Sequence, residues 1–236
     1  VLQHIRVGAT NGLGVKYMAR DDARSIGILG SGWQAETQLT AACSVRAIEK
    51  IRCFSPNQEN REAFSARMSD MLGIDVRPVA QPEEAIAGAD IVMCASNSID
   101  PIFFQHWIEP GMHLSSIKKP EIEPAAIRAA DKVAVHTHDT APILVVSKDA
   151  KFQESTKEAG WNAAKQLDFK SFPPLPDMLA KRVTGRDKPE QVTCFLNNLG
   201  LGYQFAAAGS VIYRRAKERS IGHELPTDWF TETVHP

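Results

Sequence analysis

Gly27-Ile-Leu-Gly30-Ser-Gly32-Trp-Gln-Ala35 ends an apolar, strand-like run and begins a helix-like one. In this position the pattern Gly-x-Gly-x-x-Ala predicts a loop that holds the pyrophosphate of a dinucleotide. Gly30 would form the tight turn and Gly32 would let the backbone approach the phosphates. Ala35 would allow close packing of helix on strand, and Ser31 would lie in the loop at the positive helix terminus. The alternative is a glycine turn that binds no ligand.

The residues around this loop predict the rest of the fold. Between residues 25 and 138, short apolar runs such as SIGIL, IRCF, DIVMCAS, MHLSSI and KVAVH alternate with amphipathic segments such as NREAFSARMSDML. This alternation is typical of parallel βαβ units. We expect about six strands in an α/β, Rossmann-type doubly wound sheet, and we assign residues 21–146 to this dinucleotide-binding domain.

The remaining residues predict a second, smaller domain. From residue 141 to 189 the periodicity breaks down, and the proline-rich KSFPPLPDM favours a connector. Residues 192–222 read as one long or interrupted helix that packs against the segment before Asp21. We therefore assign 1–20 and 147–236 to the remainder of a substrate and dimerisation domain. The chain begins with Val1 rather than Met, so we expect that domain to be incomplete at its N-terminus.

Composition excludes several classes of partner. The chain has 236 residues, with 27 Lys and Arg against 28 Asp and Glu, which leaves no basic field for nucleic acid or anionic lipid. No apolar run approaches the ~18 residues that would cross a membrane, and the first residues do not resemble a signal peptide. The four cysteines form no CxxC pair, so no metal site is expected. We expect a cytoplasmic protein that binds a small molecule.

The end of the second strand bears on the choice of dinucleotide. An acidic residue there would bind the adenosine ribose of NAD, but IRCF is followed by Ser55. Asn57 and Arg61 come next, and a hydroxyl, an amide and a guanidinium together can bind a 2′-phosphate. NADP(H) is therefore favoured. NAD(H) remains open, because Glu59 could bind the ribose while Arg61 stays solvated.

The fourth strand ends in Ala95, Ser96 and Asn97. The carboxyl ends of strands border the ligand crevice in open α/β sheets, so we expect these residues near the cofactor. Asp100 precedes a proline, where an aspartate is more often a turn former than a catalytic acid.

Several segments together resemble the ornithine cyclodeaminase and mu-crystallin family. These are GILGSGWQA, in which Gln34 precedes Ala35, the early Arg6-Val-Gly-Ala-Thr10 element, VTGR at 183–186 and TCFLNNLGLG at 193–202. The resemblance covers nearly the whole chain. It implies a homodimer whose second domain, formed by the N-terminal portion and a returning C-terminal helix, makes the subunit interface and the substrate pocket.

The resemblance also implies roles for particular residues. Arg6 matches an arginine that binds the carboxylate of an amino or imino acid, a role suited to a bidentate guanidinium. Thr10, Ser116, Leu199 and Gly200 would line the substrate pocket. One element departs from the family. Cyclodeaminases carry a Gly-Ala-Asp element after the fifth strand, whereas this chain reads SSIKKPEIEP and places Lys118 and Lys119 there. The departure argues against ornithine cyclisation.

Reduction of an amino-acid-derived imine is the function that this pattern favours. Hydride would pass from the nicotinamide to the C=N carbon while Arg6 holds the carboxylate, and Lys118 would polarise or protonate the nitrogen. The alternative for Lys118 is a solvated loop charge. Two other functions stay open: an amino acid cyclodeaminase that releases ammonia with bound NAD, and a non-catalytic NADPH-binding protein.

Overall fold

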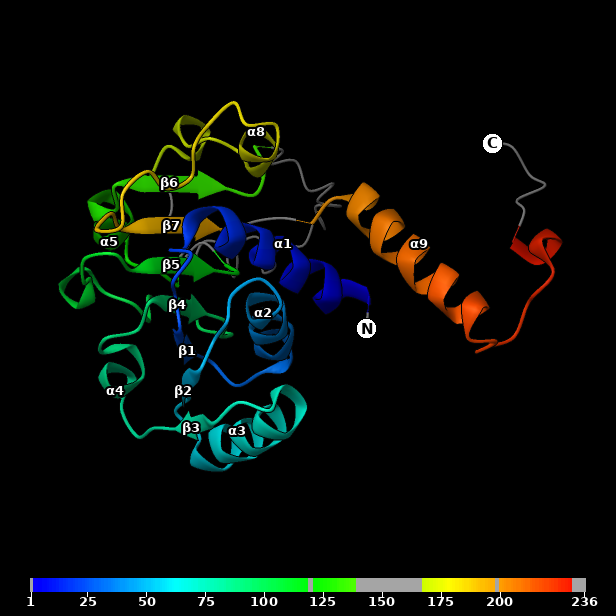
Figure 1. Ribbon diagram of the computed structural model, residues 1–236, viewed down its shortest axis with the longest axis horizontal. Coiled ribbons are helices and arrows are strands. Elements are labelled where there is room, and N and C mark those ends of the chain that lie inside the picture. Colours follow the sequence, from blue (N-terminus) through cyan, green and yellow to red (C-terminus); the bar gives the residue numbers. More distant parts are fainter. Residues whose placement is uncertain (1, 119–120, 139–166, 198–199, 231–236) are drawn as a thin grey trace, which may run out of the picture.

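The computed structural model describes residues 2–118, 121–138, 167–197 and 200–230. Its centre is a seven-stranded, all-parallel sheet in the order β3-β2-β1-β4-β5-β7-β6 (Figure 1). The strands are β1 (Ser25–Leu29), β2 (Lys50–Phe54), β3 (Val76–Pro78), β4 (Ile91–Cys94), β5 (His113–Ser116), β6 (Lys132–Val135) and β7 (Thr193–Leu196). The chain returns to the centre after β3 and builds the second half outward from β4, so the doubly wound Rossmann-type α/β fold is confirmed.

Helices cover both faces of the sheet (Figure 1). One face carries α1 (Leu2–Met18), α2 (Trp33–Cys43) and α3 (Gln58–Leu72), and the other carries α4 (Pro82–Ile86) and α5 (Pro124–Ala129). Each layer has its own apolar core. Leu39 and Phe64 pack with β1 and β2 in the first core, and Ile86 and Ile127 pack with β4 and β5 in the second. Burial on both faces explains why central strands such as β1 and β4 read as continuous apolar runs.

The sequence prediction was wrong for one strand. Residues 192–222 were expected to be helical, but Thr193–Leu196 forms β7, which pairs with β5 and β6. All four residues are buried. A short apolar run of this kind has no periodicity that separates a strand from a buried helix. Part of the range 147–236 therefore lies in the central sheet, and the division of the chain into two domains stays a prediction.

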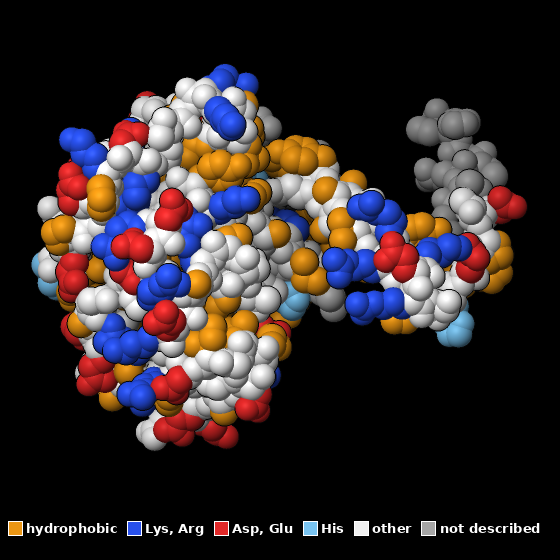
Figure 2. Space-filling view, viewed as in Figure 1, with side chains coloured by type: hydrophobic (Ala, Val, Ile, Leu, Met, Phe, Trp, Pro, Cys, Tyr) orange, Lys and Arg blue, Asp and Glu red, His pale blue; other side chains and the backbone are white. Residues whose placement is uncertain are grey.

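The C-terminal helix α9 (Gly202–Glu218) follows β7 and leaves the body of the protein (Figure 1). Its first turns pack on α1, as the sequence predicted, and the Gln204 Nε2 atom donates to Thr10 Oγ1 at 3.0 Å. Farther along, apolar side chains such as Ile212 and Tyr213 stay exposed beside a row of basic residues (Figure 2).

The predicted connector lies largely outside the described residues. Its described part contains α8 (Leu175–Leu179). Among the described residues, short 3-10 helices form at Gln105–Trp107, Phe169–Ser171 and Thr227–Phe230. Within the described ranges, the helices are too short or too polar to cross a membrane.

Candidate active site

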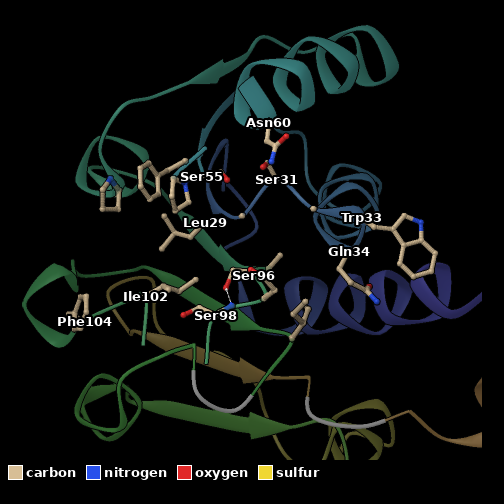
Figure 3. Close-up of a pocket in the computed structure, with 18 of the residues that line it drawn as sticks. Leu29, Ser31, Trp33, Gln34, Ser55, Asn60, Ser96, Ser98, Ile102 and Phe104 are labelled. Atoms are coloured by element: carbon tan, nitrogen blue, oxygen red, sulfur yellow. Dashed lines mark hydrogen bonds between the residues drawn. The ribbon is translucent and has the colours of Figure 1, made fainter. Parts of the chain in front are cut away.

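A cavity of about 600 Å³ opens at the carboxyl ends of β1, β2 and β4. Residues 29–34 from the β1–α2 loop, 54–56 after β2 and 95–98 after β4 form its walls, together with aromatic side chains that include Phe104 and Trp107. Figure 3 shows Ser31, Ser55 and Asn60 along one side, with Ser96, Ser98 and Ile102 across from them. None of the described lining residues carries a charge.

The glycine loop has the geometry that a dinucleotide requires. Gly30 has φ +127°, and a Cβ there would overlap the carbonyl oxygen of Ala95. A Cβ at Gly32 would meet no atom within 4 Å, so the backbone is open to the cavity at the N-terminus of α2. Ala35 is fully buried against the sheet. The loop therefore fits a pyrophosphate, which would accept from the free N–H groups of the helix terminus.

The three residues expected to select the dinucleotide are only partly brought together. Ser55 lines the cavity, whereas the side chain of Asn57 caps α3 by accepting from the Asn60 backbone at 2.8 Å. The Arg61 Nη1 atom donates to the Ser55 carbonyl at 3.1 Å. Asn60, which the sequence analysis did not single out, lines the cavity, while Glu59 is exposed and does not.

The strand ends around Ala95, Ser96 and Asn97 border the cavity as expected. A residue that no sequence pattern indicated, Glu121, fixes their positions. Glu121 is completely buried, and one carboxylate oxygen accepts from the Ser96 backbone (2.6 Å) and hydroxyl (2.9 Å). The other oxygen accepts from the backbone N–H groups of Ile117 and Lys118, each at 3.1 Å. In sequence, a glutamate within EIEP cannot be told from a solvated charge.

A second cavity, about 400 Å³, adjoins the first. The two share Gln34, Ser96, Asn97 and Ile117, and the second adds Arg6, Lys118, Asn197 and Gly200 among its lining residues. The predicted anchor Arg6 and the predicted proton donor Lys118 therefore lie in one cavity beside the dinucleotide loop. The Lys118 Nζ atom donates to the Ser98 carbonyl at 3.0 Å.

The side chain of Arg6 places a buried guanidinium in this cavity. Only 8% of it is exposed, and burial lowers the pKa of its guanidinium. Its Cζ atom lies 5.2 Å from the centre of the Phe205 ring on α9, a cation–π contact. Across the described ranges, the guanidinium forms no ion pair and Nε has no hydrogen-bond partner. A buried cation without an anion costs free energy, so the site suits an anionic ligand.

The remaining pocket predictions have different outcomes. Gly200 lines the cavity with Arg6. The Thr10 hydroxyl donates to the Arg6 carbonyl at 2.9 Å and accepts from Gln204, so Thr10 braces the helix and lines neither cavity. Ser116 is buried within β5 and also lines neither. Leu199 lies outside the described residues.

Comparison with known proteins agrees with this architecture. The model of the ornithine cyclodeaminase/mu-crystallin family matches residues 1–220. The chain belongs to this family. It is 28% identical over 229 residues to a Delta(1)-pyrroline-2-carboxylate reductase of Bacillus cereus, covering 95% of this chain and 67% of the relative. The chain thus spans about two thirds of that relative's length.

Two solved structures have the same fold. A Thermococcus litoralis Delta(1)-pyrroline-2-carboxylate reductase in complex with NADH and L-proline aligns with a TM-score of 0.78 and 28% identity, covering 95% of this chain and 68% of that one. An archaeal alanine dehydrogenase dimer with bound NAD aligns with a TM-score of 0.74 and 22% identity, covering 93% and 66%. At that identity the second comparison shows the fold alone.

Proposed function

We propose that this protein is an NAD(P)H-dependent oxidoreductase that reduces an amino-acid-derived imine. The observation that carries the proposal is the buried guanidinium of Arg6, which has no anionic partner in the described part of the chain and lines a cavity that shares a wall with the dinucleotide cavity. A carboxylate in this cavity would pair with Arg6 and leave the neighbouring carbon beside the shared wall. The relatives' reaction on Delta(1)-pyrroline-2-carboxylate supports this class of substrate.

Arg6 and Lys118 would have different roles in this reaction. Arg6 binds the carboxylate through its planar fork and orients the C=N bond. A dinucleotide held at the loop of Gly30 and Gly32 would supply the hydride for the imine carbon. Lys118 carries three ammonium protons, and one of them is used on the Ser98 carbonyl. Another can reach a ligand in the cavity, so Lys118 is the candidate that gives the proton to the imine nitrogen. Hydride on carbon and a proton on nitrogen yield the amine.

We further propose that the protein prefers NADP(H) and forms a homodimer. NADP(H) fits the uncharged cavity wall and the guanidinium of Arg61 beside Ser55, although the Thermococcus relative holds NADH. A homodimer fits the exposed apolar side chains of α9, and the archaeal alanine dehydrogenase of the same fold is a dimer.

Turnover of Delta(1)-pyrroline-2-carboxylate tests the function. The chain is mixed with this imine and NADPH or NADH, and both dinucleotide oxidation and L-proline formation are measured. Arg6→Lys keeps the charge but loses the bidentate fork, so we expect kcat/KM to fall on the order of 100-fold, equivalent to about 3 kcal/mol. Arg128→Lys, an exposed arginine on α5, serves as the matched control and should retain activity.

Other outcomes identify the competing functions. Release of ammonia from ornithine without net dinucleotide consumption would replace the reductase with a cyclodeaminase. Tight NADPH binding without turnover of any imine tested would indicate a binding protein. Equal activity of Arg6→Lys and the wild type would remove Arg6 from the substrate site.

A further inference from the structure

We propose that the side-chain carbonyl of Asn197 accepts a hydrogen bond from the substrate nitrogen, and that this residue selects nitrogen-containing acids over their oxygen analogues. The inference rests on the proposed function and adds a specificity residue to the same cavity. Asn197 lies in the segment 193–202 but was not among the expected pocket residues.

Asn197 is the first residue after β7 and is held firmly in place. Its backbone N–H donates to the Ser116 carbonyl at 2.9 Å, which continues the ladder between β7 and β5. Its side-chain Nδ2 donates to the Val7 carbonyl of α1 at 2.9 Å. Since Val7 is the neighbour of Arg6 in the chain, this bond ties the end of β7 to the turn of α1 that carries the guanidinium.

The other end of the amide has no partner. Asn197 is only 4% exposed and lines the cavity that contains Arg6, and its Oδ1 atom is buried without a hydrogen bond from any described residue. Exchange of Oδ1 and Nδ2 by rotation would place the carbonyl oxygen against the Val7 carbonyl, so the bond to Val7 fixes which end is free. An unpaired buried acceptor costs about 1–3 kcal/mol, which a ligand N–H would recover.

The chemistry of the cavity indicates which ligand group belongs there. The guanidinium of Arg6 only donates and takes a carboxylate, whereas Oδ1 of Asn197 only accepts and takes an N–H. The ammonium form of the amine product carries a carboxylate and, on the adjacent position, two N–H groups, so one N–H can face Oδ1 while the other faces Lys118. An ether acid with the same carboxylate has no hydrogen to donate, so it would set lone pairs against Oδ1 and lose this bond.

A second amide, that of the half-buried Gln34, lines the same cavity and provides the control. The Oε1 atom of Gln34 is also without a partner, but no hydrogen bond from its side chain to the described residues fixes the orientation of its amide. It can rotate to present either a donor or an acceptor. Gln34→Leu should therefore leave the preference for nitrogen unchanged.

The test compares two ring acids that differ in one atom. L-proline carries the N–H, and (S)-tetrahydrofuran-2-carboxylate has oxygen in its place. Binding of each to the chain saturated with oxidised dinucleotide is measured by calorimetry. We expect the wild type to prefer proline by at least about 10-fold, the value of one hydrogen bond to a charged donor. Asn197→Leu should reduce the ratio to about one, while Asn197→Asp, which keeps an acceptor, should retain it.

A merely structural role predicts a different pattern. Loss of the hydrogen bond from Asn197 to the Val7 carbonyl would weaken the binding of both acids equally in Asn197→Leu and Asn197→Asp. The ratio of the two affinities would then stay unchanged, and this result would overturn the inference. So would a ratio that collapses in Gln34→Leu but survives in Asn197→Leu, or equal binding of both acids by the wild type. In these cases the proposed function still stands. If the wild type binds neither acid, the proposed function fails and the inference fails with it.

Discussion

The guanidinium of Arg6 occupies the space that a side chain at Gly200 would need, because a Cβ built at Gly200 would overlap the Cζ and both Nη atoms of Arg6. These residues come from opposite ends of the chain. The contact explains why a glycine suits the turn that leads from β7 into α9, although its φ lies outside the left-handed region.

Gly200→Ala should therefore displace the guanidinium and weaken carboxylate binding. We expect KM for the imine to rise about 10-fold or more, with dinucleotide affinity unchanged, since a shifted bidentate contact loses about 1.5–3 kcal/mol. The matched control is Gly202→Ala, where a Cβ would meet no atom within 4 Å. Steady-state kinetics of both variants check the prediction. Similar behaviour of the two variants would mean that backbone flexibility, not the Arg6 contact, requires glycine at position 200.

Gly30 and Gly32 should fail in different ways. Gly30→Ala puts a methyl group into the Ala95 carbonyl at a φ that L-residues rarely adopt, so we expect at least about 2 kcal/mol loss of unfolding free energy. Gly32→Ala has free space and φ −84°, so the fold should remain intact while the methyl blocks the approach of the pyrophosphate. Urea unfolding and NADPH titration of each variant separate these effects. Normal dinucleotide binding by Gly32→Ala would contradict the assigned role of this glycine.

The contrast between predictable and unpredictable features has a physical basis. The glycine loop and the strands around it are local patterns, in which turn geometry and burial leave a mark on a few consecutive residues. The interaction of Glu121 with Ser96 and the orphaned amide of Asn197 depend on which loops meet at the sheet edge. No local pattern distinguishes a buried glutamate from a solvated one. The strand β7 was missed for the same reason, because its four buried residues form a strand only through pairing with β5 and β6.

Arg61 is expected to determine the dinucleotide preference. Its guanidinium lies beside Ser55 at the end of β2, and the described cavity wall has no carboxylate that would repel a 2′-phosphate. Calorimetric titration with NADPH and NADH should show tighter binding of NADPH, and Arg61→Ala should lower that preference by about 10-fold while hardly changing NADH affinity. Arg67→Ala is the control, because Arg67 lies farther along the same helix and pairs with Glu36 instead of contacting Ser55. NADH-favoured binding by the wild type would instead restore NAD as the cofactor.

His113 should make stability depend on pH. Burial, followed by the charges of Arg186 and Arg46, lowers the pKa of His113 to about 3. The Thr193 hydroxyl donates to the Met18 carbonyl, so its oxygen accepts from Nδ1–H of a neutral imidazole at 2.8 Å. The unfolded pKa is about 6.5, so stability is full above that pH and falls by about 1.4 kcal/mol per unit as the pH drops toward 3.

Urea unfolding across this pH range measures the effect. His113→Asn removes the titrating group while keeping an N–H near the position of Nδ1. The slope of its unfolding free energy against pH should therefore be smaller than that of the wild type by the contribution of about one proton. His106→Asn, on an exposed histidine, should follow the wild type. Parallel curves for wild type and His113→Asn would show that His113 is charged in the folded protein.

Glu121 should couple stability to ligand binding. Its carboxylate accepts four hydrogen bonds, which join the loop after β4 to the loop after β5, and both loops line the two cavities. Burial raises the pKa of Glu121, whereas the hydrogen bonds from Ser96 lower it by a smaller amount. In Glu121→Gln an NH₂ group faces one pair of these donors, which should cost about 1–3 kcal/mol of unfolding free energy and weaken dinucleotide binding about 10-fold. Glu123→Gln, whose carboxylate accepts from the Gln105 backbone, is the neighbouring control and should have a smaller effect on both quantities. A displacement of the loop at Ser96 would alter the shared wall of the two cavities and so change dinucleotide affinity. A loss of stability in Glu121→Gln with unchanged dinucleotide affinity would therefore mean that the loops keep their positions without this carboxylate.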